Sequence, residues 1–369
     1  MEHIVISFLF FNILFFIFYS NYKRGVYYVN KSNLIWYTIW LIAFGTFGGG
    51  EGDFLHYKEA VENIHSLADL FFYNGMEVQY YYLAYILDGN YYLWRLVIFS
   101  IQFIGLSWFL YKTKLNTYPV LIAFTSLFLV TSIYGRVYWG VIYYVIGLYL
   151  FIENKNPLYL ILVALCYVSH TSNLILIALL PLGFWELKRW HLVLIIVLFG
   201  SITSLFNDYF NLILDEGGVD GADYLNGKVN SYTTSGQFVF SYWGNSIGEK
   251  IIFLLRHVPL IFVLFRIMKI FMGDNKEFKL FDKPFRRIIY VYIGVNLISF
   301  VFLFADMKTG TYFYRVLAMS FFPITLILPY LMVKKQMTKH SFNLYIILFL
   351  IASEANYLKD MYYAYVAGR

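Results

Sequence analysis

Apolar runs of membrane-spanning length follow one another along the whole chain, with mostly short polar segments between them. Of its 369 residues, 60% are hydrophobic and 14% are charged, whereas a soluble domain carries about 25% charged residues. In lipid, an α-helix of about 20 residues satisfies its backbone hydrogen bonds within one segment. The sequence therefore predicts an all-α, polytopic transmembrane helical bundle with about 11–12 membrane segments. Because no soluble block of domain size interrupts the runs, residues 1–369 are expected to form a single membrane domain.

The distribution of charge assigns the loops to the two sides of the membrane. Lys and Arg gather in short loops, as cytoplasmic loops do, so the net charge of +6 requires no nucleic-acid partner. Two long acidic loops, residues 48–90 and 207–248, are expected outside, and the N-terminus with them. The predicted spans are Ile4–Ser20, Leu34–Phe47, Tyr91–Tyr111, Tyr118–Ile133, Val137–Ile152, the run Leu158–Phe184, His191–Phe206, Glu249–Ile270, Ile288–Phe304, Thr311–Val333 and the short run Phe342–Ala352.

The run Leu158–Phe184 is predicted to enter and leave the membrane on the same side. If it crossed once, the acidic loop 207–248 would lie in the cytoplasm and the basic stretch Arg266–Arg287 outside, against the positive-inside rule. A bend at Ser169–Asn173 into two half-spans, meeting near the outer face, brings all loops into agreement. The polar side chains of that segment can satisfy the freed backbone groups, which lipid cannot. The alternative is a straight buried helix in which His170 bonds to a neighbour.

The sequence lacks the motifs for disulfide formation, metal binding, nucleotide binding and serine-hydrolase chemistry. Cys166 is the only cysteine, so no internal disulfide forms and no Cys/His metal cluster is present. There is no Walker loop, no G-x-S-x-G elbow and no H-E-x-x-H. No metal and no cofactor are therefore expected, and ATP-driven transport is disfavoured. The first run lacks the cationic start and cleavage site of a signal peptide, so it is interpreted as a retained span.

A set of ionisable residues is predicted to lie near the outer boundary of the membrane. Charged groups at membrane depth cost about 2.5–3.5 kcal/mol even on an insertion scale, so they face protein, water or a ligand. Converging arginines would form an anion site, since the guanidinium fork matches phosphate oxygens and stays charged. For a single arginine, the alternative is snorkelling to headgroups or a structural pair with an outer carboxylate. The set comprises Asp53, Arg95, Arg136, His170, Arg256, His257 and Arg315.

His170 and Asp53 are the candidates for proton transfer. Imidazole titrates near neutral pH, so His170 suits a general base or a hydrogen-bond donor, or else a satisfied structural role. Asp53 follows Glu51 in an acidic pair that suits cation binding, a sugar hydroxyl or a helix cap, although no further metal ligand is identifiable. His257 is expected to be structural or interfacial. The tyrosines of Tyr80–Tyr85 suit stacking on sugars or an interfacial aromatic belt.

Taken in order along the chain, these features resemble the EpsG family within the Wzy-type polysaccharide polymerases of bacteria. Each motif is short, so the resemblance depends on their order over most of the chain. The sequence departs from the family at residues 77–79, which read Glu-Val-Gln where the family often has Glu-Pro-Gly. The matching features are Gly49–Tyr57, Glu77–Tyr111 with Arg95, Arg136 at the head of a span, Ser169–Leu176 with His170, and Arg315.

The resemblance implies a metal-independent, glycosyltransferase-type polymerase of the bacterial plasma (inner) membrane, with a fold similar to lipid-dependent membrane glycosyltransferases. It would join repeat units carried by undecaprenyl pyrophosphate into a surface polysaccharide, alongside a flippase and a chain-length regulator. In this interpretation Arg136 and Arg315 hold the pyrophosphate and stabilise its developing charge, and His170 activates the acceptor hydroxyl. Asp53 is a second candidate base, and further substrate-binding roles fall to Arg95, Arg256 and Tyr57.

Three other functions stay open at the level of sequence. A flippase for the same lipid-linked units should show internal repeats and charges near the midplane, and this sequence shows neither. A membrane O-acyltransferase modifying surface glycans also uses Arg and His, but its acyl donor is cytoplasmic. A non-enzymatic assembly or anchoring subunit would tolerate substitution of single arginines.

Overall fold

The computed structural model describes residues 2–48, 53–64, 66, 78–129, 136–170, 173–188, 190–201, 247–272, 278, 281–305 and 316–366. Within these ranges every regular element is a helix, apart from one isolated bridge between Tyr28 and Thr117, which confirms the all-α prediction. The chain forms two compact units, Met1–Ile177 with Phe321–Arg369, and Ala178–Ser320. The single membrane domain stays a prediction, and the outer loop 207–248 falls almost wholly outside the described residues.

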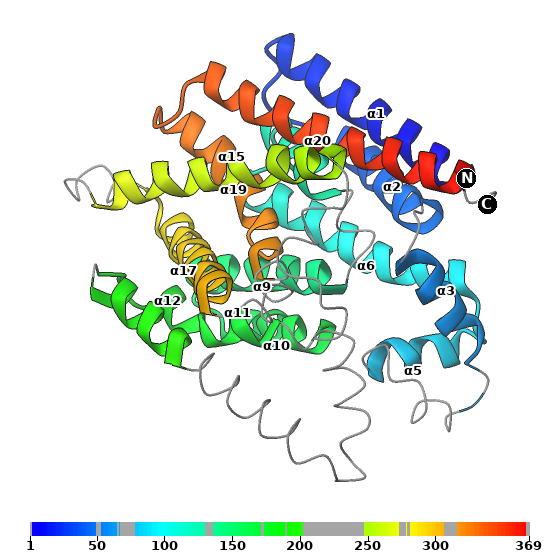
Figure 1. The fold of residues 1–369 in the computed structure, drawn as a ribbon, viewed down its shortest axis with the longest axis horizontal. Helices are drawn as coiled ribbons and strands as arrows, with labels where there is room; N and C mark the ends of the chain where they lie inside the picture. Colours follow the sequence, from blue (N-terminus) through cyan, green and yellow to red (C-terminus); the bar gives the residue numbers. More distant parts are fainter. Residues whose placement is uncertain are drawn as a thin grey trace. The chain divides into compact units, whose positions relative to one another are not determined.

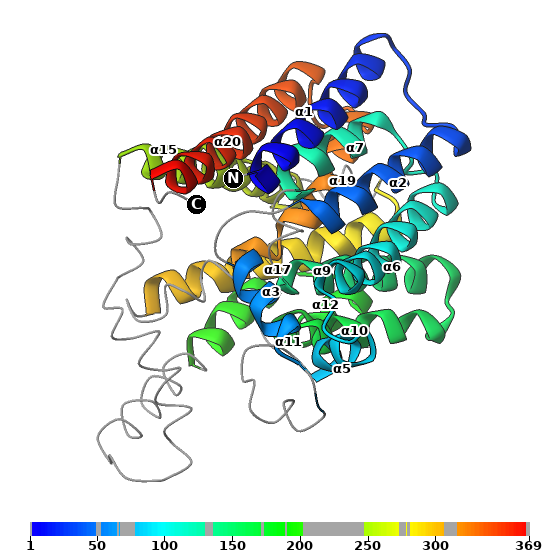
Figure 2. The ribbon, with the colours of Figure 1, turned by 90° about the vertical axis from the view of Figure 1, so that its right-hand side faces the viewer.

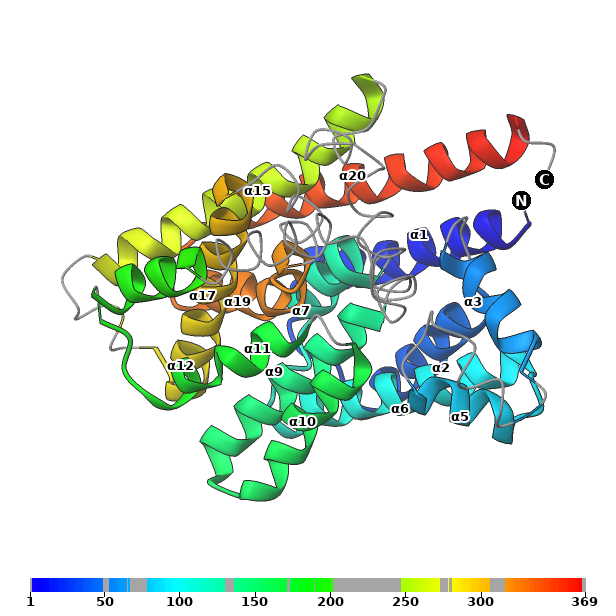
Figure 3. The same cartoon turned by 60° about the horizontal axis from the view of Figure 1, so that its bottom comes forward.

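The first unit is a helical bundle in which the first and last helices lie side by side (Figures 1 and 2). Helix α1 packs against α2, α7 and α20, while α2 packs on α6 and α9 on α10 (Figure 3). Helix α19 contacts both α7 and α9, and its residues from Phe321 to Leu331 are buried. The helices are α1 (Glu2–Lys23), α2 (Lys31–Phe47), α3 (Asp53–Glu62), α5 (Val78–Ile86), α6 (Tyr91–Lys112), α7 (Tyr118–Ala123), η1 (Phe124–Leu129), α9 (Arg136–Asn154), η2 (Pro157–Tyr159), α10 (Leu160–Ser169), α19 (Phe321–Val333) and α20 (Lys339–Val366).

One end of this unit gathers the loops that the charge rule assigns to the cytoplasm. The Val29 N–H donates to the Asn116 carbonyl at 2.9 Å, which joins the α1–α2 loop to the α6–α7 loop. The Lys339 ammonium lies 4.9 Å from the centre of the Tyr22 ring, which brings the α19–α20 turn to the same end. This basic end carries Lys23, Arg24, Lys31, Lys112, Lys114, Lys334, Lys335 and Lys339. The grouping agrees with a cytoplasmic location for these loops.

Apolar side chains cover the outside of the helices, which indicates contact with lipid. Phe16 on α1 is 71% exposed and Trp36 on α2 is 60% exposed, whereas soluble monomers rarely expose large contiguous apolar patches. Five helices in the described part are long and apolar enough to cross a membrane, so the chain is a multi-pass membrane protein. They are Ile4–Lys23, Tyr91–Lys112, Lys283–Val301, Val316–Val333 and Lys339–Lys359, with shorter apolar helices at Tyr118–Leu129, Pro157–Tyr167 and Trp190–Ser201.

The C-terminal helix extends well beyond the predicted short run Phe342–Ala352. Helix α20 continues to Val366, because no Gly or Pro interrupts it and its polar residues Glu354 and Lys359 are good helix formers. The Ser353 hydroxyl on α20 donates to the Ser126 carbonyl at 2.8 Å. Ser126 belongs to the π-helical segment η1, where wider winding disturbs the normal helical hydrogen bonding. Ser353 therefore satisfies a backbone carbonyl that lipid could not.

The second unit is built around α17 (Lys283–Ala305), on which α12 (Leu180–Phe184) and α15 (Ile247–Met272) both pack. A short helix, Trp190–Ser201, follows α12. A Cβ added to Gly294 of α17 would lie 2.8 Å from the Leu182 side chain. Glycine at this position therefore allows α12 to approach α17 closely.

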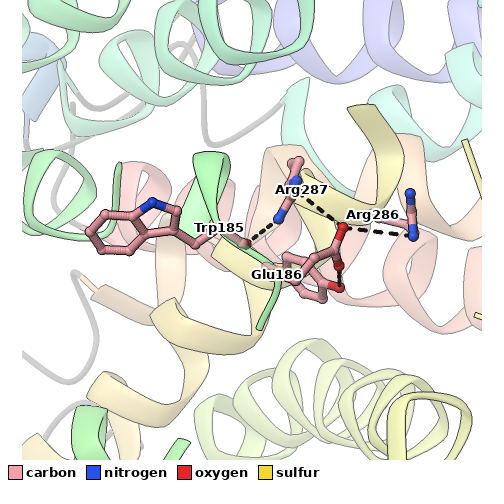
Figure 4. A network of polar contacts seen from close by, with 5 residues as sticks. Trp185, Glu186, Arg286 and Arg287 are labelled. Carbon is pink, nitrogen blue, oxygen red and sulfur yellow. Dashed lines mark hydrogen bonds and ion pairs between the residues drawn. The ribbon is translucent and has the colours of Figure 1, made fainter. Parts of the chain in front are cut away.

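Glu186, just after α12, is held by the first turns of α17 (Figure 4). The Tyr290 hydroxyl donates to Glu186 Oε2 at 2.6 Å, and Arg287 Nη2 donates to Oε1 at 3.0 Å. Arg286 completes the ion pair at 3.8 Å, and Arg287 also donates to the Trp185 carbonyl. The network fixes the segment after α12 at the basic end of α17.

Candidate functional site

Helix α10 ends where a bend was predicted. It runs from Leu160 to Ser169, and His170 follows with extended backbone at φ −165° and ψ 134°. The next helix, α11 (Leu174–Ala178), begins four residues later, whereas Thr171 and Ser172 lie outside the described residues. The predicted interruption of the helix is confirmed. The return of the second half to the cytoplasmic side stays a prediction.

Asn173 bridges the two sides of this interruption. Its N–H donates to the His170 carbonyl at 2.9 Å, and its Nδ2 donates to the Cys166 carbonyl at 3.0 Å. In a continuous helix the Cys166 carbonyl would accept from His170, but the His170 N–H bonds Tyr167 instead at 3.2 Å. Asn173 is completely buried. Its amide therefore satisfies a carbonyl that the helix end frees at membrane depth.

Helix α9 lies against the interruption through a glycine. A Cβ added to Gly140 would lie 2.1 Å from Asn173 Nδ2 and 2.7 Å from the Cys166 carbonyl oxygen. A Cβ added to Gly147, two turns further along, would lie 2.8 Å from the Tyr159 carbonyl oxygen. Small residues of this kind let membrane helices pack backbone against backbone. Only glycine at position 140 permits the observed distance between α9 and Asn173.

Arg136 is the first residue of α9 and precedes Gly140 by about one helical turn. Positions i and i+4 of a helix share one face. Position 136 therefore lies on the same face and at the same end of α9 as the residue that contacts Asn173. The side chain of Arg136 is outside the described part of the structure, so its bonds stay a prediction.

The same turn of α9 packs against the part of α6 that carries Arg95. The ring centre of Trp139 lies 6.2 Å from that of Trp94 and 5.6 Å from that of Phe99. The Arg95 guanidinium lies 5.2 Å from the centre of the Phe99 ring. The start of α9 thus packs on the part of α6 that carries Arg95 and, through Gly140, on Asn173, three residues after His170. Arg95 and His170 both lie at the end of the first unit opposite its basic loops.

Arg95 is 3% exposed, and several partners surround its guanidinium. Nη1 donates to the Tyr91 hydroxyl at 2.9 Å, and Nη2 donates to the Gly48 carbonyl at 2.8 Å. Nε donates to the Gly45 carbonyl at 2.8 Å. These bonds give Arg95 a structural role at the end of α2. Its predicted role in substrate binding stays a prediction.

The other predicted residues are distributed over both units. Asp53 begins α3, which packs on α6, and Tyr57 in the same helix is 8% exposed. Arg256 lies on α15 in the second unit beside the buried His257, and Arg315 lies outside the described residues. The structure therefore gathers positions 95, 136 and 170 at one end of one unit. The convergence of Arg256 and Arg315 with them stays a prediction.

Neither Gly140 nor Asn173 is among the residues that the sequence predicted for the site. The available signals were the glycine pair Gly140 and Gly147 within one span, a pattern typical of close helix packing, and the polar residue at the end of the predicted bend. Among the described residues, no three His, Cys, Asp or Glu side chains lie together in a way that could hold a metal ion.

The fold and this site define a polytopic helical membrane protein with a buried arginine and a half-buried histidine at the same end of its bundle. The EpsG family matches residues 31–366 of the chain, and the protein belongs to this family. Membership indicates a polymerase-type function in surface polysaccharide biosynthesis. No curated protein and no solved structure shows significant similarity to the chain.

Proposed function

We propose that the protein polymerises oligosaccharide repeat units carried by undecaprenyl pyrophosphate, at the outer face of the bacterial plasma membrane. A hydroxyl of one lipid-linked repeat unit attacks the anomeric carbon of the reducing-end sugar on a second lipid carrier. The new glycosidic bond forms as the bond from that carbon to the pyrophosphate oxygen breaks. Undecaprenyl pyrophosphate leaves with the bonding electron pair, and a base takes the hydroxyl proton. A flippase supplies the units, and a chain-length regulator is a further expected partner.

One structural relationship carries the proposal. Helix α9, which begins at Arg136, contacts the interrupted helix through Gly140 at Asn173, three residues after His170. An arginine position and a histidine from different helices therefore lie at the same end of the bundle, away from its basic loops. Such residues at membrane depth are a functional-site hypothesis in themselves. Membership of the EpsG family supports the choice of a lipid-linked sugar as the substrate.

The roles follow from the chemistry of each group. The donor's leaving group is a pyrophosphate that gains negative charge in the transition state, and Arg136 with Arg315 would stabilise this charge. His170, half-buried at the helix interruption, would accept the proton of the attacking hydroxyl. Asp53 is the second candidate for that base, and Tyr57 and Arg256 would contact the remainder of the substrate. Arg95 would contribute mainly by fixing the end of α2.

The test compares His170→Ala with His340→Ala in cells that lack any other copy of the protein. His340 is an exposed histidine in the first turn of α20, at the basic end. At matched protein levels in the membrane, His170→Ala should abolish long polysaccharide chains on gels, and lipid-linked single units should accumulate. His340→Ala should give the normal chain-length distribution. A normal distribution in His170→Ala would refute the assignment of this residue.

A further inference from the structure

Asn173 makes two hydrogen bonds to the end of α10 at the interruption that follows Ser169. Asn173 contributes a backbone bond to the His170 carbonyl and a side-chain bond to the Cys166 carbonyl, at 2.9 Å and 3.0 Å. It therefore ties the chain after the break to two carbonyls at the end of α10. Because Asn173 is completely buried, these bonds form without competition from water.

The position of Asn173 is in turn fixed by α9. A Cβ added to Gly140 would lie 2.1 Å from Asn173 Nδ2. The amide therefore packs directly against the backbone of α9. The bond to Cys166 and the contact with Gly140 restrain the amide from two different helices. The His170 backbone, bonded to Asn173, is thereby tied to α9 four residues after Arg136.

We propose that Asn173 is a positioning residue that places the His170 imidazole relative to the first turn of α9. The inference rests on the proposed function, because it assigns Asn173 the task of orienting the base of that reaction. A general base must lie within hydrogen-bonding reach of the proton it takes. A displacement of about 1 Å can cost on the order of 100-fold in rate.

The first experiment replaces Asn173 with two residues of similar size. Asn173→Leu removes the donor to the Cys166 carbonyl, whereas the carboxyl introduced by Asn173→Asp can donate only while protonated. Polymerisation is measured in membrane vesicles from cells lacking the native copy, supplied with lipid-linked repeat units extracted from the same cells. We expect Asn173→Leu to lower kcat at least about tenfold with little change in KM. The relative rate of Asn173→Asp should fall as the pH rises, because deprotonation removes the donor.

A second experiment approaches the same contact from the other helix. Gly140→Ala places a methyl group on the Asn173 amide, and Gly105→Ala is its matched control, because an added Cβ there meets no atom within 4 Å. Both substitutions exchange glycine for alanine inside a helix of the first unit. Gly140→Ala should lower kcat as Asn173→Leu does, and Gly105→Ala should leave it unchanged.

The outcomes separate this inference from the proposed function. If His170→Ala is inactive and Asn173→Leu retains the native kcat at an equal amount of folded protein, the positioning role is wrong and the function of His170 stands. If His170→Ala is fully active, the proposed base is wrong, and the inference falls with it. A pH profile of Asn173→Asp parallel to that of the native protein would also overturn the positioning role, since a purely structural defect would scale the rate equally at every pH.

Discussion

Arg95 Nη2 donates to the carbonyl oxygen of Gly48 at 2.8 Å, and the two residues stand 47 positions apart in the chain. Gly48 caps the C-terminus of α2, where the last carbonyls lack partners within the helix and carry partial negative charge. A buried guanidinium thus complements the end of a neighbouring helix.

Replacing Arg95 with Gln should destabilise the protein. The shorter amide cannot reproduce the bonds to both Gly45 and Gly48, and each buried carbonyl left without a partner costs about 1–3 kcal/mol. We expect a lower midpoint of thermal unfolding in detergent, measured by heating followed by fluorescence-detected size-exclusion chromatography. The matched control is Lys112→Gln, an exposed cation at the other end of α6, which should change stability by less than about 0.5 kcal/mol. Equal midpoints for both variants would contradict the capping role.

The sequence predicted the helix interruption at His170 and assigned its freed backbone groups to the polar segment that ends at Asn173, which the bond from Asn173 to the Cys166 carbonyl confirms. The interruption was predicted from two features. The charges of the flanking loops require residues 158–184 to cross the membrane an even number of times, and five polar or ionisable residues lie within this apolar run. The contact of Asn173 with Gly140 cannot be predicted from the sequence. A glycine in a membrane helix indicates close packing but does not show which residue lies against it. The same limit applies to the bonds of Arg95 to the Gly45 and Gly48 carbonyls, because a backbone acceptor leaves no trace in residue types.

The helical class was the most predictable property, because a polypeptide in lipid has few ways to satisfy its backbone. Boundaries were harder to predict where polar residues occur inside helices. The predicted last run stops at Ala352, shortly before Glu354 and Lys359, yet neither of these residues breaks a helix, and α20 continues past both. The presence of Ser353 inside this apolar helix is accounted for by its bond to Ser126, 227 positions earlier, which the sequence alone does not reveal.

Lys188 offers a direct test of the two predicted half-spans. If the run from residue 158 to 184 bends and returns, Lys188 lies in the cytoplasm, and a single crossing would place it outside. Lys188 is exposed, and the natural cysteine, Cys166, is buried. A membrane-impermeant maleimide should therefore label Lys188→Cys only after the cells are opened. Exposed Asp88→Cys should be labelled in intact cells and exposed Lys155→Cys should not. Labelling of Lys188→Cys in intact cells would establish a single crossing.

The contact between Tyr290 and Glu186 should contribute measurably to the second unit. Tyr290→Phe removes a 2.6 Å hydrogen bond to the carboxylate and should lower the free energy of unfolding by about 1 kcal/mol, because Glu186 is half exposed. Glu186→Gln weakens the same contact and the ion pair with Arg287. The two losses should be less than additive in a double-mutant cycle of unfolding midpoints. Strict additivity would show that the two side chains stabilise the protein independently.

Arg136 and Arg315 should prove to act on the same leaving group. If each stabilises the departing pyrophosphate, replacement by Ala should lower the polymerisation rate about 100- to 1,000-fold, as does loss of one transition-state donor. Lys keeps the charge but loses the two-pronged geometry, so Arg136→Lys should be impaired less than Arg136→Ala. The double Ala variant should be scarcely slower than either single variant, because groups that act as a unit are not additive.

The control is Arg24→Ala, which replaces an exposed arginine at the basic end and should polymerise normally. The measurement is the chain-length distribution at matched membrane levels, together with the initial rate in vesicles. Long chains in normal amounts from Arg136→Ala would exclude a role for this residue at the pyrophosphate.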